Sequence, residues 1–233
     1  MATRGEHDGS ADATLYHPLV LRIEGLRVLV VGGGGVGSRR AILLAEKGAE
    51  VKVVSLEFSP ELDNAKKLYG VELIEGGIDK AREYLDWASM LIIAVPWSGE
   101  AEDLAREALR KGKLVNTAPE GRLGNVIFPF AEDLSGLIVA ITSLGVSGLA
   151  ARRALERVIE VLKNDPEIAC LYETHGRLKL RMKKSIQDPT IRMRIHMALW
   201  QDVEYRRLCA SGLLGEAWRR ALEVARDIAG REV

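Results

Sequence analysis

Short apolar runs alternate with amphipathic stretches through the first half of the chain. The runs are rich in Val, Ile and Leu and show no regular polar alternation, which is typical of strands buried on both faces of a parallel sheet. The predicted strands span residues 27–31, 50–54, 71–74, 90–95 and 113–115. The helices predicted between them span residues 38–47, 60–68, 78–84 and 98–111. Strand and helix in repetition predict an α/β fold with a doubly wound parallel sheet.

The pattern changes after Asn116. Two further strands are predicted over residues 126–130 and 137–142, separated by a polar turn. A long amphipathic helix follows over residues 147–163, with Ser147 as its candidate N-cap. The remainder of the chain is helical by composition. The sequence therefore predicts a sheet domain, a short connecting segment and a helical C-terminal part.

The N-terminal residues predict neither a signal peptide nor a membrane anchor. Residues 1–15 are polar and rich in small side chains, which predicts a frayed tail. The apolar run over 16–21 is interrupted by Pro18 and is expected to form an extended arm or at best an edge strand. No apolar run approaches the ~20 residues that span a bilayer. We therefore expect a cytoplasmic protein with no membrane partner.

The charges are balanced over the whole chain but uneven along it. The sequence has 233 residues, with 33 basic and 33 acidic side chains. Residues 1–150 carry 16 basic and 21 acidic groups, a net charge of −5, and residues 151–233 carry 17 and 12, a net charge of +5. A neutral chain gives no support to electrostatic binding of nucleic acid. The basic second part is suited to an anionic ligand or to attraction by the acidic first part.

Two cysteines, Cys170 and Cys209, lie 39 residues apart. The sequence has no CxxC pattern and no Cys/His cluster, which argues against a zinc site. Because disulfides are rare in a reducing cytosol, we expect both to be free, buried thiols.

A glycine-rich loop follows the first predicted strand. Gly32, Gly34 and Gly37 form the pattern GxGxxG at the start of a predicted helix. The first glycine allows a tight turn, the second lets a pyrophosphate approach the backbone, and the third lets the helix pack closely on the strand. The helix N-terminus then faces the phosphates. The loop predicts a dinucleotide site, and the alternative is a glycine turn that serves packing alone.

Glu57 favours NAD over NADP as the dinucleotide. It lies 20 residues after Gly37, just past the second predicted strand. A carboxylate at this spacing binds both ribose hydroxyls and repels a 2′-phosphate. Arg39 and Arg40 weaken this preference slightly.

Several motifs together resemble one family. They are GGGxVxxR(R/K) in the glycine loop, SLEFSPEL after the second strand, Asn116, the Ile-Phe-Pro of 127–129, and SxGxSxxxAR over 143–152. In these features the chain resembles the precorrin-2 dehydrogenase module of siroheme synthases. The resemblance covers roughly residues 16–163 and extends to the helical part. The SxGxSxxxAR stretch is its most specific element, because GxGxxG alone fits many families.

The resemblance implies a three-part subunit. Residues 1–116 would form a Rossmann domain that binds NAD, residues 117–163 a segment exchanged across a two-fold axis in a homodimer, and residues 164–233 a helical domain that helps form the tetrapyrrole cleft. The implied reaction is NAD-dependent oxidation of precorrin-2 to sirohydrochlorin, and some family members also insert ferrous iron. The implied cofactor-binding residues are Gly32, Gly34, Gly35, Val36, Gly37, Leu56 and Glu57. The implied substrate-binding residues are Asn116, Arg122, Ser143, Ser147, Arg152 and Arg153, and no resident metal is expected.

The chain departs from the family pattern where the catalytic residue is expected. The family carries an aspartate a few residues after the asparagine, and that position is Pro119 here. The adjacent Glu120 is the candidate acid or base, and the alternative is a solvated loop residue. The family also carries a Thr-Asp pair after the strand predicted over 90–95. This chain has Val-Pro-Trp-Ser at 95–98 instead. A non-catalytic protein that binds NAD or a tetrapyrrole is therefore a second hypothesis, and an unrelated Rossmann enzyme or NAD-sensing regulator is a third.

The basic second part is chemically suited to precorrin-2, which carries eight carboxylates. Residues 177–194 hold seven basic groups and one acid, and lack the interleaved aromatic residues typical of nucleic-acid binding. The alternative is a solvated basic face. His175 and His196 are too far apart in sequence to suggest a metal pair, although either could line the tetrapyrrole site.

Overall fold

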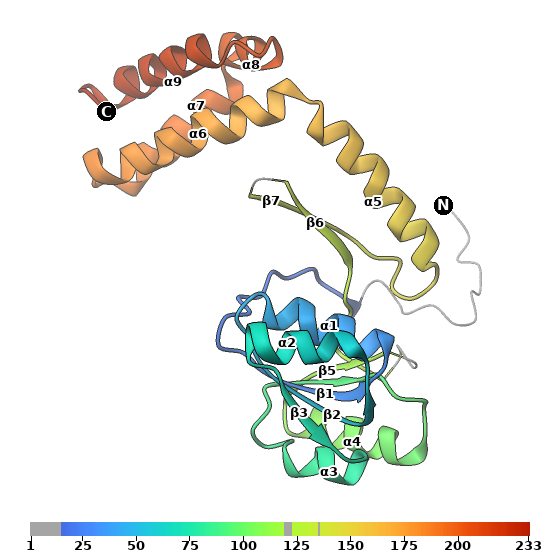
Figure 1. The fold of residues 1–233 in the computed structure, drawn as a ribbon. Coiled ribbons are helices and arrows are strands. Elements are labelled where there is room, and N and C mark those ends of the chain that lie inside the picture. Colours follow the sequence, from blue (N-terminus) through green and yellow to red (C-terminus); the bar gives the residue numbers. More distant parts are fainter. Residues whose placement is uncertain (1–14, 119–122, 135) are drawn as a thin grey trace. The chain divides into compact units, whose positions relative to one another are not determined.

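The computed structural model describes residues 15–118, 123–134 and 136–233, and Figure 1 shows the fold. Contacts divide the chain into two compact units. The first comprises the described residues up to Phe130 together with 140–152, and the second comprises those of 131–139 together with 153–233. The predicted tail lies mostly outside the described residues, and residues 16–21 form no strand.

The first unit is built on a five-stranded parallel sheet with the strand order β3-β2-β1-β4-β5. Its strands are β1 (Arg27–Gly33), β2 (Glu50–Phe58), β3 (Glu72–Glu75), β4 (Met90–Ile93) and β5 (Leu114–Thr117). Val28 pairs with Val51 on one side and with Met90 on the other. The chain winds outward from β1 in both directions, so the sheet has a switch point between β1 and β4, where ligands of open α/β sheets bind. The predicted fold class is confirmed.

Helices cover both faces of this sheet (Figure 1). They are α1 (Gly35–Ala45), α2 (Pro60–Tyr69), α3 (Ile78–Glu83) and α4 (Gly99–Arg110). Val28 and Val30 of β1 belong to a core shared with α1 and α2, whereas Leu29 and Val31 belong to the opposite core, which contains residues of α3 and α4. Residues 28–33 of β1 are therefore all buried, which explains why the apolar run lacks alternation.

A two-stranded sheet follows, formed by β6 (Phe130–Leu134) and β7 (Leu137–Ile141). The strand predicted over 126–130 is wrong, because only Phe130 of that range is in a strand. The backbone N–H of Val126 donates to the Val115 carbonyl (3.0 Å), so this segment is tied to β5. The predicted N-cap of α5 (Gly148–Lys163) is confirmed, since Ser147 Oγ accepts from the Ala150 N–H (3.2 Å).

The second unit contains four further helices, α6 (Pro166–Ser185), α7 (Pro189–Gln201), α8 (Val203–Ala210) and α9 (Leu214–Ala229). An aspartate caps each of the first three, at positions 165, 188 and 202. Proline at the first turn of α6 and α7 suits a helix start, because its missing N–H would have no partner there. The prediction of a helical C-terminal part is confirmed.

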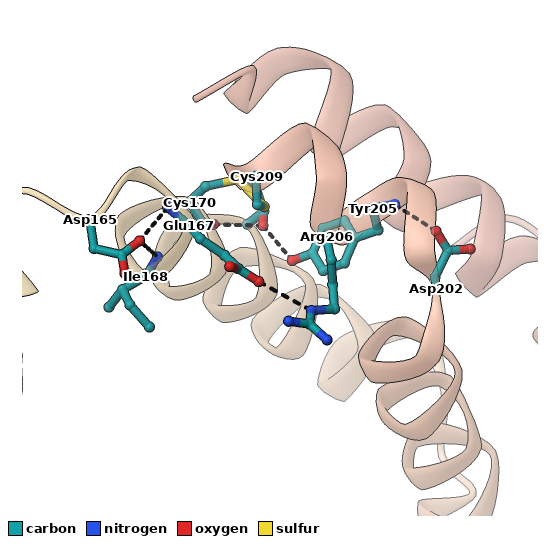
Figure 2. Close-up of a disulfide and its surroundings, with 9 residues drawn as sticks. Asp165, Glu167, Ile168, Cys170, Asp202, Tyr205, Arg206 and Cys209 are labelled. Carbon is teal, nitrogen blue, oxygen red and sulfur yellow. Dashed lines mark hydrogen bonds and ion pairs between the residues drawn. A yellow bond between two sulfur atoms is a disulfide. The ribbon is translucent and has the colours of Figure 1, made fainter. Parts of the chain in front are cut away.

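A disulfide joins Cys170 on α6 to Cys209 on α8 (Figure 2). The prediction of two free thiols is therefore wrong. The two helices pack so that the Cα atoms are 5.2 Å apart and both residues are buried. In the same region Tyr205 Oη and Thr174 Oγ1 form a hydrogen bond (2.6 Å) in the buried core. The pairing depends on how α6 and α8 pack, which spacing in the sequence does not reveal.

Candidate functional site

The glycine loop follows the buried part of β1 and leads directly into α1. Gly32 has a φ of +109°, and a Cβ there would lie 2.7 Å from the Ala94 carbonyl oxygen. A Cβ on Gly37 would lie 1.9 Å from the Gly32 carbonyl oxygen. Gly32 is thus required by backbone conformation and packing, and Gly37 by the close approach of α1 to β1.

Gly34 differs from these two positions. It is exposed, has a φ of −78°, and a Cβ there would meet no atom within 4 Å. It also forms the N-cap of α1 without a side-chain hydrogen bond, and the first turn of α1 contains no acidic residue. The protein itself therefore gives no reason for glycine at this position, whereas an anion approaching the helix N-terminus would.

A hydrogen-bonded group of residues joins the glycine loop to β2. Ser38 Oγ donates to the Gly33 carbonyl (2.8 Å), and the backbone N–H of Ser59 donates to the same oxygen (2.9 Å). The Ser59 hydroxyl donates to Ser38 Oγ (2.8 Å). These serines hold the ends of β1 and β2 together, and sequence reasoning missed both.

A cleft of about 750 Å³ lies at the carboxyl ends of the strands, beside the switch point. Its walls come from the glycine loop, the end of β2, residues 76–78 and residues 94–96. Of the residues predicted to bind the cofactor, Gly32, Gly34, Leu56 and Glu57 line the cleft. The other three, Gly35, Val36 and Gly37, open α1 and are not part of the lining.

Glu57 lies within β2, which is longer than predicted, and its side chain is exposed in the cleft wall. Neither arginine that was expected to weaken the preference for NAD lines this cleft. Arg39 is exposed, and Arg40 lines a different cavity.

The second cavity, of about 190 Å³, also belongs to the first unit. Arg40 Nη1 donates to the side-chain oxygen of the buried Asn116 (2.5 Å), whose amide nitrogen donates to the Val126 carbonyl (2.7 Å). The Arg40 guanidinium lies over the Phe128 ring, 5.2 Å from its centroid. Burial, and next the neighbouring charge of Arg39, lower the pKa of Arg40 from its usual value. The sequence motifs singled out Asn116 and the Ile-Phe-Pro of 127–129, but they did not reveal that Arg40 meets them.

The predicted substrate-binding residues are only partly brought together. Asn116 and Ser143 line the second cavity, whereas Ser147 and Arg152 do not. Ser147 caps α5, and Arg153 lies in the second unit, where it pairs with Glu156. Glu120 and Arg122 lie outside the described residues, as does Pro119.

In the second unit, two histidines that are distant in sequence meet between α6 and α7. His175 Nε2 and His196 Nδ1 are 2.5 Å apart. Burial lowers the pKa of both imidazoles, and the charge of Lys179 lowers them further. His196 is also affected by His175 and Arg192. Within the described part of the chain, no three His, Cys, Asp or Glu side chains are grouped to hold a metal ion.

Two of the basic residues of 177–194 make contacts within the second unit. Arg177 stacks on Trp218, with 4.6 Å between the guanidinium carbon and the ring centroid. Arg192 donates to the backbone carbonyls of Ile186 and Gln187 at the end of α6 (2.6 and 2.8 Å). These two cations therefore have structural roles that the charge count alone does not reveal.

The sequence of the sheet unit matches a known family model. Residues 19–130, just under half of the chain, match the family described as putative NAD(P)-binding. The siroheme synthase of Photorhabdus laumondii is 28% identical over 205 residues, and that of Pseudomonas fluorescens strain SBW25 is 34% identical over 190 residues. The chain resembles siroheme synthases. The resemblance inferred from the sequence motifs is thus confirmed.

The siroheme synthases are longer than this chain. The aligned regions cover 87% and 81% of this chain but 42% and 39% of those two proteins. Among solved structures, SirC, a precorrin-2 dehydrogenase, matches with a TM-score of 0.66 and 20% sequence identity, covering 91% of this chain and 100% of that one. This likeness shows the shared fold. No helix among the described residues is long and apolar enough to cross a membrane.

Proposed function

We propose that this protein is an NAD-dependent oxidoreductase that converts precorrin-2 to sirohydrochlorin. The observation that carries the proposal is the cleft at the switch point of the sheet, open at Gly34 and bounded by Glu57, in a chain similar to siroheme synthases over most of its length. The similar fold of SirC, whose name gives its activity as precorrin-2 dehydrogenase, supports the same substrate. We also propose that the protein acts in the cytoplasm as a homodimer.

The residues of the cleft fit a dinucleotide. The exposed backbone of Gly34, Gly35 and Val36 at the N-terminus of α1 would bind the pyrophosphate. The Glu57 carboxylate would accept hydrogen bonds from the ribose hydroxyls, and its charge would repel a 2′-phosphate. Gly32 and Gly37 shape the loop, and Leu56 forms part of the wall. When bound, NAD accepts the hydride that leaves precorrin-2.

The reaction also releases a proton, which a base must accept. Oxidation of precorrin-2 releases one hydride and one proton, so a base beside the substrate would assist. The proposed base is Glu120, the one carboxylate in the sequence between Asn116 and Arg122. That segment follows β5, whose carboxyl end lies at the ligand-binding edge of the sheet. Asn116 and Ser143, which line the second cavity, would contact the tetrapyrrole.

Incubation with precorrin-2 and either NAD or NADP tests the proposal. We expect sirohydrochlorin to form, measured by its absorbance, and NAD to bind more tightly than NADP. Glu120→Gln should lower turnover by roughly 10²-fold while leaving NAD affinity unchanged, because general base catalysis contributes about this factor. Asp103→Asn, an exposed carboxylate of α4 outside the cleft lining, is the control.

The outcomes separate the alternatives. Equal affinity for the two cofactors would remove Glu57 from the proposed site. Wild-type turnover in Glu120→Gln would exclude Glu120 as the base. A wild-type protein that binds NAD but forms no product would favour a non-catalytic binding protein, for which Pro119 in place of the family aspartate supplies the reason.

A further inference from the structure

Among the described residues, the side chains of Arg40, Thr142 and Ser143 bring hydrogen-bond donors to the second cavity that its described lining leaves at least partly unused. Its polar side chains are those of Arg40, Asn116, Thr117, Thr142 and Ser143, and no Asp or Glu is among its described lining residues. The apolar lining includes Val126, Ile127 and the aromatic rings of Phe128 and Phe130. A cavity with a cation and hydroxyls but no carboxylate is suited to receive an anion.

Two hydroxyls of this cavity each accept one backbone hydrogen bond. Ser143 Oγ accepts a hydrogen bond from the Ser147 N–H (2.8 Å). Thr142 Oγ1 accepts one from the Leu144 N–H (3.0 Å). Each hydroxyl keeps its own proton for donation to another acceptor. The tight turn through Leu144 and Gly145, with φ values of +53° and +90°, holds the two residues in this arrangement.

Arg40 supplies the charge. Its guanidinium carries five N–H donors. Among the described residues, one of these donors is used, in the hydrogen bond from Nη1 to Asn116. No carboxylate among the described residues forms an ion pair with it. The half-buried side chain lies over Phe128, which limits its access to water. A bound carboxylate would compensate this desolvation through charge-assisted hydrogen bonds.

We propose that Arg40, Thr142 and Ser143 form a receptor for one side-chain carboxylate of the substrate. This inference rests on the proposed function, which supplies a substrate with carboxylate-bearing side chains. The volume of about 190 Å³ is too small for a tetrapyrrole ring but suits one acetate or propionate arm. The cavity shares none of its described lining residues with the glycine cleft, so the receptor and the cofactor site are separate parts of the first unit.

Substitution of Arg40 tests the receptor. Arg40→Gln should raise the KM for precorrin-2 and the Kd for sirohydrochlorin by roughly 10- to 100-fold, because a charge-assisted hydrogen bond is lost. It should leave NAD affinity unchanged. Arg40→Lys keeps the charge and should lose less affinity for both tetrapyrroles than Arg40→Gln. Thr142→Val keeps the shape of an exposed side chain and should weaken sirohydrochlorin binding by about 3- to 10-fold.

Arg39→Gln is the matched control, because Arg39 is the adjacent arginine, is exposed and lines neither cavity. Sirohydrochlorin binding is measured by titration without NAD, and circular dichroism monitors folding. Tetrapyrrole affinity in Arg40→Gln and Thr142→Val equal to that of Arg39→Gln would overturn the receptor alone. A wild-type protein that binds NAD but neither tetrapyrrole would overturn the receptor and the proposed function together.

Discussion

At the scale of single residues, the glycines of one motif have different physical reasons for lacking a side chain. Gly37 is required by packing, since its Cβ would lie 1.9 Å from the Gly32 carbonyl oxygen. Gly34 has open space around it and ordinary backbone torsions. The motif alone does not distinguish these cases, although it predicts correctly that the third glycine lets α1 approach β1.

This difference predicts opposite behaviour of two variants. Gly34→Val should lower the melting temperature only slightly, because valine is a poorer N-cap than glycine, and should lose detectable NAD binding, because the side chain fills the space proposed for the pyrophosphate. Gly37→Ala should lower the free energy of unfolding by about 1–3 kcal/mol through overpacking. Thermal unfolding and NAD titration of both variants check this. Wild-type NAD affinity in Gly34→Val would contradict the proposed role of the loop.

At the scale of elements, the helices of the second unit are held by more than apolar packing. The disulfide joins α6 to α8 across 39 residues of sequence, and Arg206 on α8 pairs with Glu167 on α6 (3.1 Å; Figure 2). The ion pair is partly exposed to water and contributes little. The disulfide restricts the conformations of the unfolded chain, and its sulfurs, buried in the folded unit, become accessible to external thiols when the helices unfold.

Loss of the disulfide should destabilise the helical unit. Replacement of Cys170 and Cys209 by alanine is expected to lower the free energy of unfolding by about 2–4 kcal/mol, as estimated for a loop of this length. Denaturant unfolding followed by circular dichroism measures the change. Dithiothreitol should lower the stability of the wild-type protein towards that of the double variant, and should leave the variant itself unaffected. If dithiothreitol destabilised the wild-type protein and the double variant equally, the disulfide would not be what stabilises the helical unit.

At the scale of the whole molecule, the proposed homodimer involves residues 117–163. Large apolar side chains are exposed in this part of the single chain, with Ile138 of β7 at 60% and Val161 of α5 at 66%. Exposed apolar groups of this kind are common at subunit interfaces. The three proposed domains, 1–116, 117–163 and 164–233, remain a prediction beside the two contact-defined units.

The dimer predicts a measurable mass. Light scattering at micromolar concentration should give about twice the chain mass of 25.6 kDa. Ile138→Asp and Val161→Asp should shift the protein towards the monomer, because a charge in an apolar interface costs several kcal/mol. Leu180→Asp, at an exposed apolar position of α6 outside the proposed segment, is the control. A wild-type monomer at this concentration would contradict the proposal.

The sequence by itself determined the elements of the sheet unit. Runs such as 27–31 and 90–95 lie between two layers of helices, and burial on both faces leaves a local signature that needs no knowledge of the neighbours. The glycine loop, the N-cap Ser147 and the spacing to Glu57 are local in the same sense. Each of these features depends on residues that lie close together in the sequence, or on a motif whose neighbouring strand and helix can also be predicted from the sequence.

Tertiary structure alone decided the features that join distant segments. Arg40 meets Asn116 across 76 residues, His175 meets His196 across 21, and Cys170 meets Cys209 across 39. β6 starts later than its apolar pattern predicted because residues 125 and 126 bond to β5 instead. These outcomes depend on how whole elements pack, and a side chain's neighbours across a packed interface leave no periodic trace in the sequence around it.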